Sequence, residues 1–161
     1  MSEQSDDIDF ALAAFCEDGV WQVQPIAPPA FESVPALGRA LRHLPGDTGA
    51  VAMVAVDEDF FVLVRVAGST TRVLLSDVTA AEQWELAQSA IDFLGLPPPD
   101  DEDVQVPAGD LDLLGDLGMH AIDMGVLIDD VELYPDEMLS DIARRLGFGR
   151  LFDDAVGLTS A

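Results

Sequence analysis

The side chains best suited to metal or nucleophilic chemistry, Cys16, His43 and His120, stand far apart in this sequence. A zinc deaminase needs His and Cys ligands in a His-x-Glu and a Pro-Cys-x-x-Cys arrangement. Proline follows two residues after His43, isoleucine two residues after His120, and Cys16 is the only cysteine. That ligand set therefore does not exist, and one cysteine forms no internal disulfide. We interpret both histidines as structural and Cys16 as a small apolar side chain in the core.

The aspartates of residues 110–116 are spaced like the start of a calcium-binding loop. Such a loop has oxygen ligands at positions 1, 3 and 5, glycine at 6 and glutamate at 12. Asp110, Asp112 and Gly115 fit, but Leu114 occupies position 5 and Ala121 occupies position 12. Glycine-rich phosphate loops are absent as well. We therefore predict no metal, no cofactor and no catalytic residue, which favours a protein that is not an enzyme.

Charge is the strongest feature of the composition. The 161 residues include 31 acidic residues and only 7 basic ones, all arginine, for a net charge of −24. Nucleic-acid binding depends on Lys and Arg contacts to phosphates, so direct binding to nucleic acid is not expected. Two interpretations stay open. Acidity can simply keep the protein soluble, or it can complement a protein partner that has a basic surface.

Two features are candidates for such a partner interface. Trp21 lies on a predicted edge hairpin, where an exposed aromatic side chain could anchor a partner. A run of four carboxylates, Asp100, Asp101, Glu102 and Asp103, follows three consecutive prolines. The run is typical of a solvated charged segment.

The elements that position these residues begin with a hairpin. Apolar segments at 8–16 and 20–26 flank Glu17-Asp18-Gly19, a strong signal for a tight turn. A helix is predicted over 32–44, with Ser33 at its N-cap or in its first turn.

The stretch from 49 to 95 is the most regular part of the chain. Three short apolar segments at 50–56, 60–66 and 72–75 predict strands, the first of them covered on both faces. Asp77 is placed to cap the helix that follows, whose apolar stripe contains Trp84, Ala87, Ile91 and Leu94. Trp84 and Phe93 are predicted core residues, and Gly95 ends the helix.

Beyond this stretch, residues 96–110 read as an acidic, proline-rich linker and 111–161 as a helical segment. Helices are predicted over 120–130, 135–146 and 151–156. In the first of these, Ile122, Val126 and Leu127 are predicted to face the core.

The element order is therefore ββαβββα plus a helical C-terminal segment. Short connections between consecutive strands predict an α+β fold with an antiparallel sheet of about five strands and helices packed on it. The order is similar to that of profilin-like domains of the longin and roadblock type, which serve mostly as interaction platforms. The predicted division is a sheet domain over 1–95, a linker over 96–110 and a helical segment over 111–161.

Six segments carry a resemblance to the actinobacterial family of tRNA adenosine deaminase-associated proteins. They are 9–23, 73–81 (VLLSDVTAA), 94–95, 117–118, 132–137 (ELYPDE) and 146–148. The resemblance spans roughly residues 9 to 157. It implies association with an enzyme that converts a wobble adenosine of tRNA to inosine, and it brings no catalytic residues.

The first hypothesis is thus a non-catalytic accessory or regulatory partner of a tRNA adenosine deaminase. A second hypothesis is an interaction module of longin-like type or homodimer whose partner is unrelated to tRNA. A third is an enzyme with an unrecognised site, which would need a convergent pocket of polar residues. No signal peptide or membrane-spanning run is recognisable, so we expect a cytoplasmic protein with no membrane contact.

Overall fold

The computed structural model describes residues 8–26, 33–44, 49–56, 59–82, 84–96, 107–130 and 132–156. Its strands are β1 (Ile8–Glu17), β2 (Val20–Pro25), β3 (Ala50–Val56), β4 (Phe60–Ala67), β5 (Thr70–Leu75) and β6 (Ala108–Gly109). Its α-helices are α1 (Val34–Arg42), α2 (Glu85–Leu94), α3 (Ala121–Ile128), α4 (Pro135–Leu146) and α5 (Gly149–Val156). Short 3₁₀ turns cover Val78–Glu82 and Gly115–Leu117.

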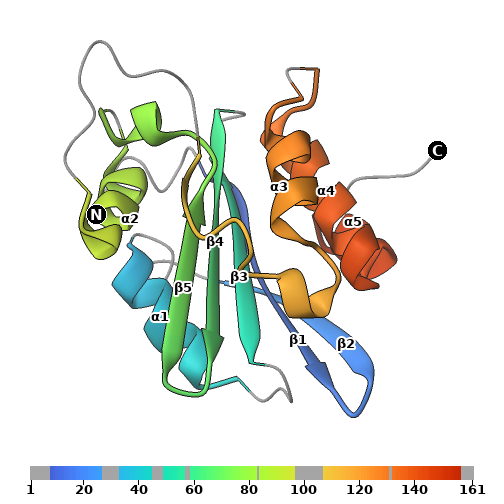
Figure 1. Cartoon of the computed structure of the whole chain (residues 1–161). Coiled ribbons are helices and arrows are strands. Elements are labelled where there is room, and N and C mark those ends of the chain that lie inside the picture. Colours follow the sequence, from blue (N-terminus) through green and yellow to red (C-terminus); the bar gives the residue numbers. More distant parts are fainter. Residues whose placement is uncertain are drawn as a thin grey trace.

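One antiparallel sheet in the order β2-β1-β3-β4-β5-β6 forms the centre of the molecule (Figure 1). The predicted hairpin joins β1 to β2 through Asp18 and Gly19, which have φ angles of 53° and 81°. Such positive values suit these residue types and match the twist of a two-residue turn. The α+β class is confirmed, with six strands in the described residues where the sequence predicted about five.

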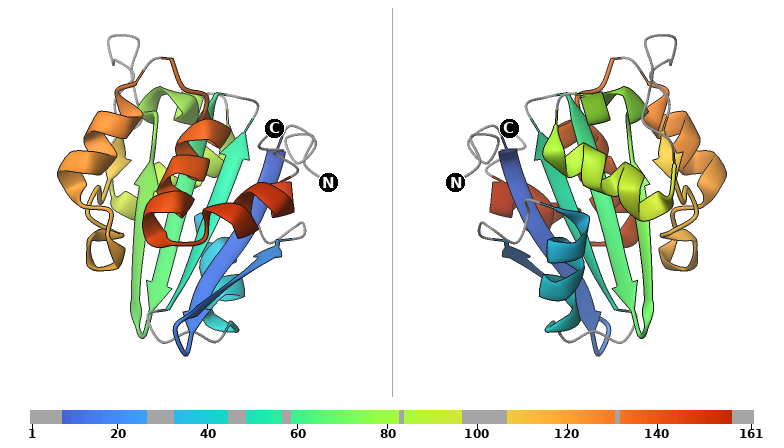
Figure 2. Two further views of the ribbon diagram at one scale, coloured as in Figure 1. Left: turned by 90° about the vertical axis from the view of Figure 1, so that its right-hand side faces the viewer. Right: turned by 90° about the vertical axis from the view of Figure 1, so that its left-hand side faces the viewer.

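Helices cover both faces of this sheet, so the molecule has three layers. Helices α1 and α2 lie on one face and α3, α4 and α5 on the other (Figure 1). The two views of Figure 2 show α4 and α5 across one face and α1 and α2 across the other. Every residue of β3 is buried, and so is all of β4 except Ala67. Covered faces on both sides explain why these strands are almost continuously apolar.

The first face packs against α1 and α2. Alternate residues of the strands, including Val54, Val62 and Val64, form one apolar core with Leu37 and Ile91 of these helices. Helix α1 begins as predicted, because the Ser33 side chain accepts a hydrogen bond from the Ala36 amide at 3.2 Å. The Ser89 hydroxyl of α2 accepts a bond from the Val34 amide at 2.9 Å, which joins the two helices.

The second face packs against the C-terminal helices, in a separate core. Met53, Phe61 and Leu63 of the sheet belong to one apolar cluster with Leu139 and Phe152. The segment after residue 110 therefore forms one of the two helical layers and lies against the same strands as α1 and α2.

The sequence did not predict β6. This strand lies within 96–110, the stretch interpreted as a linker, and its two residues pair with Leu74 and Leu75 of β5. Gly109 has a φ of 113°, and a Cβ there would stand 2.3 Å from the Val73 carbonyl oxygen. Only glycine fits so close to the neighbouring strand.

Between residues 77 and 95, the start of the helix and the position of Phe93 differ from the prediction. Asp77 accepts hydrogen bonds from the amide and hydroxyl of Thr79 at 2.9 and 2.6 Å, and so caps the 3₁₀ turn. Helix α2 begins only at Glu85, after Trp84. Trp84 packs on the core as predicted, but Phe93 is 44% exposed and is not a core residue. Phe93 lies on the part of the helix surface next to the apolar stripe that faces the sheet.

Candidate partner-binding surface

Helix α3 places apolar side chains in solvent. Met124 and Leu127 are buried against the sheet, whereas Ile122 is 82% and Val126 68% exposed. The prediction that Ile122 and Val126 face the core was therefore wrong. Because α3 is apolar on most of its circumference, sequence periodicity could not show which stripe packs on the sheet.

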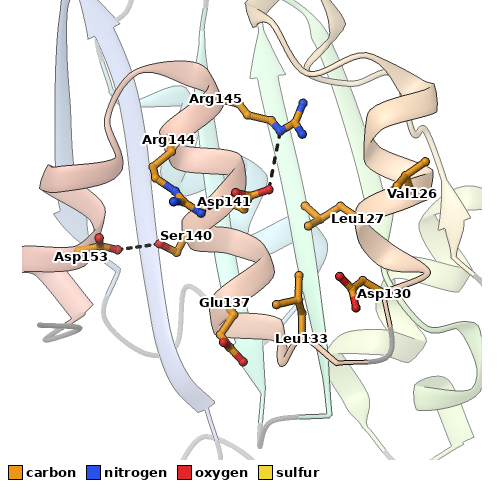
Figure 3. Close-up of a pocket in the computed structure, with 10 residues that line it drawn as sticks. All are labelled: Val126, Leu127, Asp130, Leu133, Glu137, Ser140, Asp141, Arg144, Arg145 and Asp153. Carbon is orange, nitrogen blue, oxygen red and sulfur yellow. Dashed lines mark hydrogen bonds and ion pairs between the residues drawn. The ribbon is translucent and has the colours of Figure 1, made fainter. Parts of the chain in front are cut away.

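A groove of about 500 Å³ runs between α3 and α4 (Figure 3). Its lining comes from α3, the α3–α4 connection, α4 and the facing turn of α5: Val126, Leu127, Asp130, Leu133, Glu137, Ser140, Asp141, Arg144, Arg145 and Asp153. Apolar side chains thus lie between charged ones, a composition found in sites that bind both by burial and by charge.

The charges of this α3–α4 groove are distributed unevenly along it. Arg144 donates to Asp141 at 2.6 Å, and Arg145 lies 3.7 Å from Asp141 and 3.9 Å from Asp123. Both arginines stand near the C-terminal end of α4, while Glu137 and Asp130 stand at the opposite end of the groove (Figure 3). The arginine end of the groove therefore carries charges of both signs in ion pairs, and the opposite end carries only negative charges.

Local hydrogen bonds fix the acidic end. The Tyr134 amide donates to Glu137 at 3.1 Å, where Glu137 occupies the third position of α4 after Pro135. Asp130 likewise accepts a bond from the Glu132 amide at 3.0 Å. Acidic residues are favourable at a helix N-terminus, so the sequence ELYPDE both starts α4 and places carboxylates at the surface.

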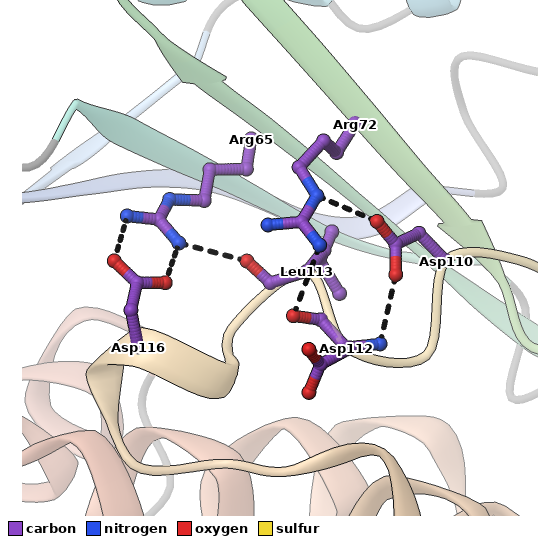
Figure 4. Close-up of polar contacts among 6 residues, drawn as sticks. All are labelled: Arg65, Arg72, Asp110, Asp112, Leu113 and Asp116. Carbon is purple, nitrogen blue, oxygen red and sulfur yellow. Dashed lines mark hydrogen bonds and ion pairs between the residues drawn. The ribbon is translucent and has the colours of Figure 1, made fainter.

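The connection that leads into α3 is held to the sheet by Arg65 of β4 (Figure 4). Arg65 is only 4% exposed and donates to both carboxylate oxygens of Asp116 and, at 2.8 Å, to the Leu113 carbonyl. This hydrogen bond from Arg65 holds the pKa of Asp116 below its usual value of 3.8. A bidentate pair of this kind fixes geometry strongly.

Arg72 makes a parallel contact one strand further out. It stands opposite Arg65 in the β4–β5 register and donates to Asp110 at 2.5 Å and to the Asp112 carbonyl at 3.3 Å. Asp110, considered above as the first ligand of a calcium loop, is thus a partner of Arg72, and Asp116 in the same segment is a partner of Arg65. Within the described ranges, no three His, Cys, Asp or Glu residues form a group able to hold a metal.

The structure places the predicted interface residues as follows. Trp21 is half-buried, with its ring 4.7 Å from that of Phe148, so its indole packs within the molecule against the start of α5. Residues 100–103, with Asp100, Asp101, Glu102 and Asp103, lie outside the described residues. A role of either in partner binding stays a prediction.

The three residues considered for chemistry do not come together. Cys16 is half-buried near the end of β1, His43 ends α1, and His120 precedes α3. Helices α1 and α3 cover opposite faces of the sheet (Figure 1). Sequence reasoning missed the groove because its lining residues are ordinary helix-surface types. The feature that marks this region is the exposure of Ile122 and Val126, which the sequence does not reveal.

The class defined by this structure is an α+β sheet protein covered by two helical layers, with an acidic groove on the C-terminal layer. The chain belongs to the Rv3753c-like tRNA adenosine deaminase-associated protein family, whose model matches residues 9–149. It is 41% identical to protein Rv3753c of Mycobacterium tuberculosis over 142 residues, covering 86% of this chain and 82% of the relative.

No solved structure matches the chain. The likeness to longin and roadblock domains, which depended on element order, therefore stays a prediction. Among the helices of the described residues, none has the length and apolar character needed to cross a membrane.

Proposed function

We propose that this protein is a non-catalytic accessory partner of a tRNA adenosine deaminase. The observation that carries the proposal is the family match over residues 9–149, since that family is described as tRNA adenosine deaminase-associated. The net charge of −24 adds a physical reason for the association. The proposed role is to regulate or stabilise the enzyme.

The charge argument starts from the substrate of the enzyme. A protein that binds tRNA presents Lys and Arg side chains to the phosphates. An acidic protein is attracted to the same kind of surface and reaches it rapidly, because long-range attraction raises the association rate. Such a partner could cover the enzyme when tRNA is absent and leave when tRNA competes for the surface.

Co-purification of the two full-length proteins tests the association. We expect them to elute together from a gel-filtration column at low ionic strength and to separate as salt is raised, because salt screens exposed charges. Separate elution at every salt concentration, including the lowest, would contradict the proposal.

A rate assay tests the non-catalytic part. Deamination of tRNA should be undetectable with this protein alone, and the rate with the deaminase present should change when this protein is added. The positions of Cys16, His43 and His120 on separate elements support this expectation, since the zinc chemistry of a deaminase needs its ligands together. Inosine formation by the protein alone would refute it.

A further inference from the structure

We propose that the α3–α4 surface binds a basic amphipathic helix of the partner protein. This surface consists of the exposed residues Ile122 and Val126 of α3 together with the α3–α4 groove. The inference rests on the proposed function for the partner's identity, the deaminase, and adds where and how that partner binds.

The apolar part of the argument begins with residue spacing. Ile122 and Val126 are four residues apart on α3, so their side chains lie on one helix face. Val126 also lines the groove, together with the apolar residues Leu127 and Leu133. An apolar strip therefore continues from the outside of α3 into the groove. A helix that lays an apolar face into such a groove is a common mode of peptide recognition.

The charges around the groove indicate that the occupant is positively charged. Nine acidic residues and three arginines lie between residues 121 and 156. Within the groove, Arg144 and Arg145 are close to Asp141, which leaves Glu137 and Asp130 as the charges of the other end. Basic side chains on the occupant would meet these two carboxylates while its apolar face covers Val126.

The same charges argue against a second copy of this chain as the occupant. Two copies would bring together surfaces that are both acidic, in molecules that each carry −24. Like-charge contact of this kind is unfavourable and suppresses self-association. An RNA occupant is disfavoured for the same electrostatic reason.

The surface is prepared for binding in the free protein. Asp116 and Leu113, in the connection before α3, are bonded to Arg65 of the sheet, and Met124 and Leu127 anchor α3 itself in the core. A partner would therefore not have to order α3, which reduces the entropy cost of association.

Binding of the source organism's own tRNA adenosine deaminase to variants of this chain tests the apolar contacts. The double variant Ile122→Ser and Val126→Ser should weaken binding by more than tenfold. The matched control is Phe93→Ser and Leu96→Ser, which changes two exposed apolar residues of the opposite helical layer. The control should bind within about twofold of the wild type. Urea denaturation verifies that each variant is folded.

A second pair of variants tests the charges. Asp130→Asn with Glu137→Gln removes two charges and keeps the oxygens that accept backbone hydrogen bonds. Its control, Glu17→Gln with Asp92→Asn, removes two exposed charges elsewhere. The groove variant should bind more weakly and with a smaller salt dependence, mainly through a slower association rate. The control variant should lose much less affinity for the deaminase.

The outcomes separate the two proposals. If the deaminase binds the wild type and both groove variants equally well, the α3–α4 surface is not the binding site, and the proposed function stands. If the deaminase binds no form of the chain at low ionic strength, the proposed function fails and the occupant proposed here fails with it. Sedimentation could instead show that the wild type is a dimer and that the double variant Ile122→Ser and Val126→Ser is a monomer. The occupant would then be a second copy of this chain, and the inference would be overturned.

Discussion

The two helical layers bury similar apolar faces of one sheet, yet they differ in charge and in what they expose. Helices α1 and α2 contain two acidic residues and two arginines, whereas α3, α4 and α5 contain six acidic residues and three arginines. The α3–α5 layer also receives the Arg65 and Arg72 contacts from the sheet, and it presents Ile122 and Val126 to solvent.

This difference separates features that build the core from features that we propose to bind a partner. Both layers are needed to cover strands such as β3 and β4, which have no polar face. Among the described residues, only the α3–α5 layer combines exposed apolar side chains, an acidic groove and ion pairs that hold the connection before α3 to the sheet. We therefore expect variants in the two cores to behave alike, and variants at the two surfaces to behave differently.

The largest expected effect tests the similarity of the cores. Leu37 of α1 and Leu139 of α4 are both fully buried. Leu37→Ala and Leu139→Ala should each lower the free energy of unfolding by about 3 kcal/mol, because each leaves a cavity. Both variants should unfold in a single urea transition, since both layers pack on the same strands.

Two separate transitions in Leu139→Ala, seen by different probes, would contradict this. They would show that the C-terminal segment folds as a domain of its own, as the predicted division at residues 96–110 would allow.

The next effect concerns the ion pairs that distinguish the α3–α5 layer. Asp116→Ala leaves the buried Arg65 without its carboxylate and should cost about 2 kcal/mol, less than for a fully buried pair because Asp116 itself is 57% exposed. Asp110→Ala should cost less than about 1 kcal/mol, since Arg72 and Asp110 are both about one-third exposed. Chemical denaturation measures both, and a larger loss in Asp110→Ala would reverse the ranking of the two pairs.

A smaller effect depends on pH. The pKa of Asp116 is lowered in the folded state by its hydrogen bond to Arg65, so the unfolded state binds more protons near the usual value of 3.8. The contribution of this pair is therefore complete above about pH 5 and is lost as pH falls through the folded pKa. The stability difference between wild type and Asp116→Asn should shrink below pH 3.8. A constant difference down to pH 2 would show that ionisation of Asp116 is not its source.

These layers also show what the sequence could predict. Local signals were sufficient for the hairpin at Asp18 and Gly19, for the Ser33 cap and for β3, because each depends on nearby residues. The C-terminal helices were predicted for the same reason. By contrast, β6 is two residues long, and its pairing with β5 depends on contacts distant in sequence.

The candidate surface was harder to predict than the fold. Trp21 packs its ring on Phe148, a contact distant in the chain that the sequence could not show. Its predicted role at a partner interface stays a prediction. In α3, either apolar stripe could have faced the sheet, and only the packing of Met124 and Leu127 decides between them. Exposure of apolar side chains is a tertiary property that periodicity does not determine.

The smallest expected effect on stability is also the one that best isolates binding. Ile122→Ser and Val126→Ser should together change the free energy of unfolding by less than about 1 kcal/mol, because both side chains are largely in solvent and bury little area on folding. Serine has about the same helix propensity as isoleucine and valine, so the substitutions add little cost of that kind. Urea denaturation of this double variant and of Leu139→Ala compares exposed with buried residues of the same helical layer. A loss approaching that of Leu139→Ala would mean that the two exposed residues support the fold, which would remove the reason to assign them to a partner.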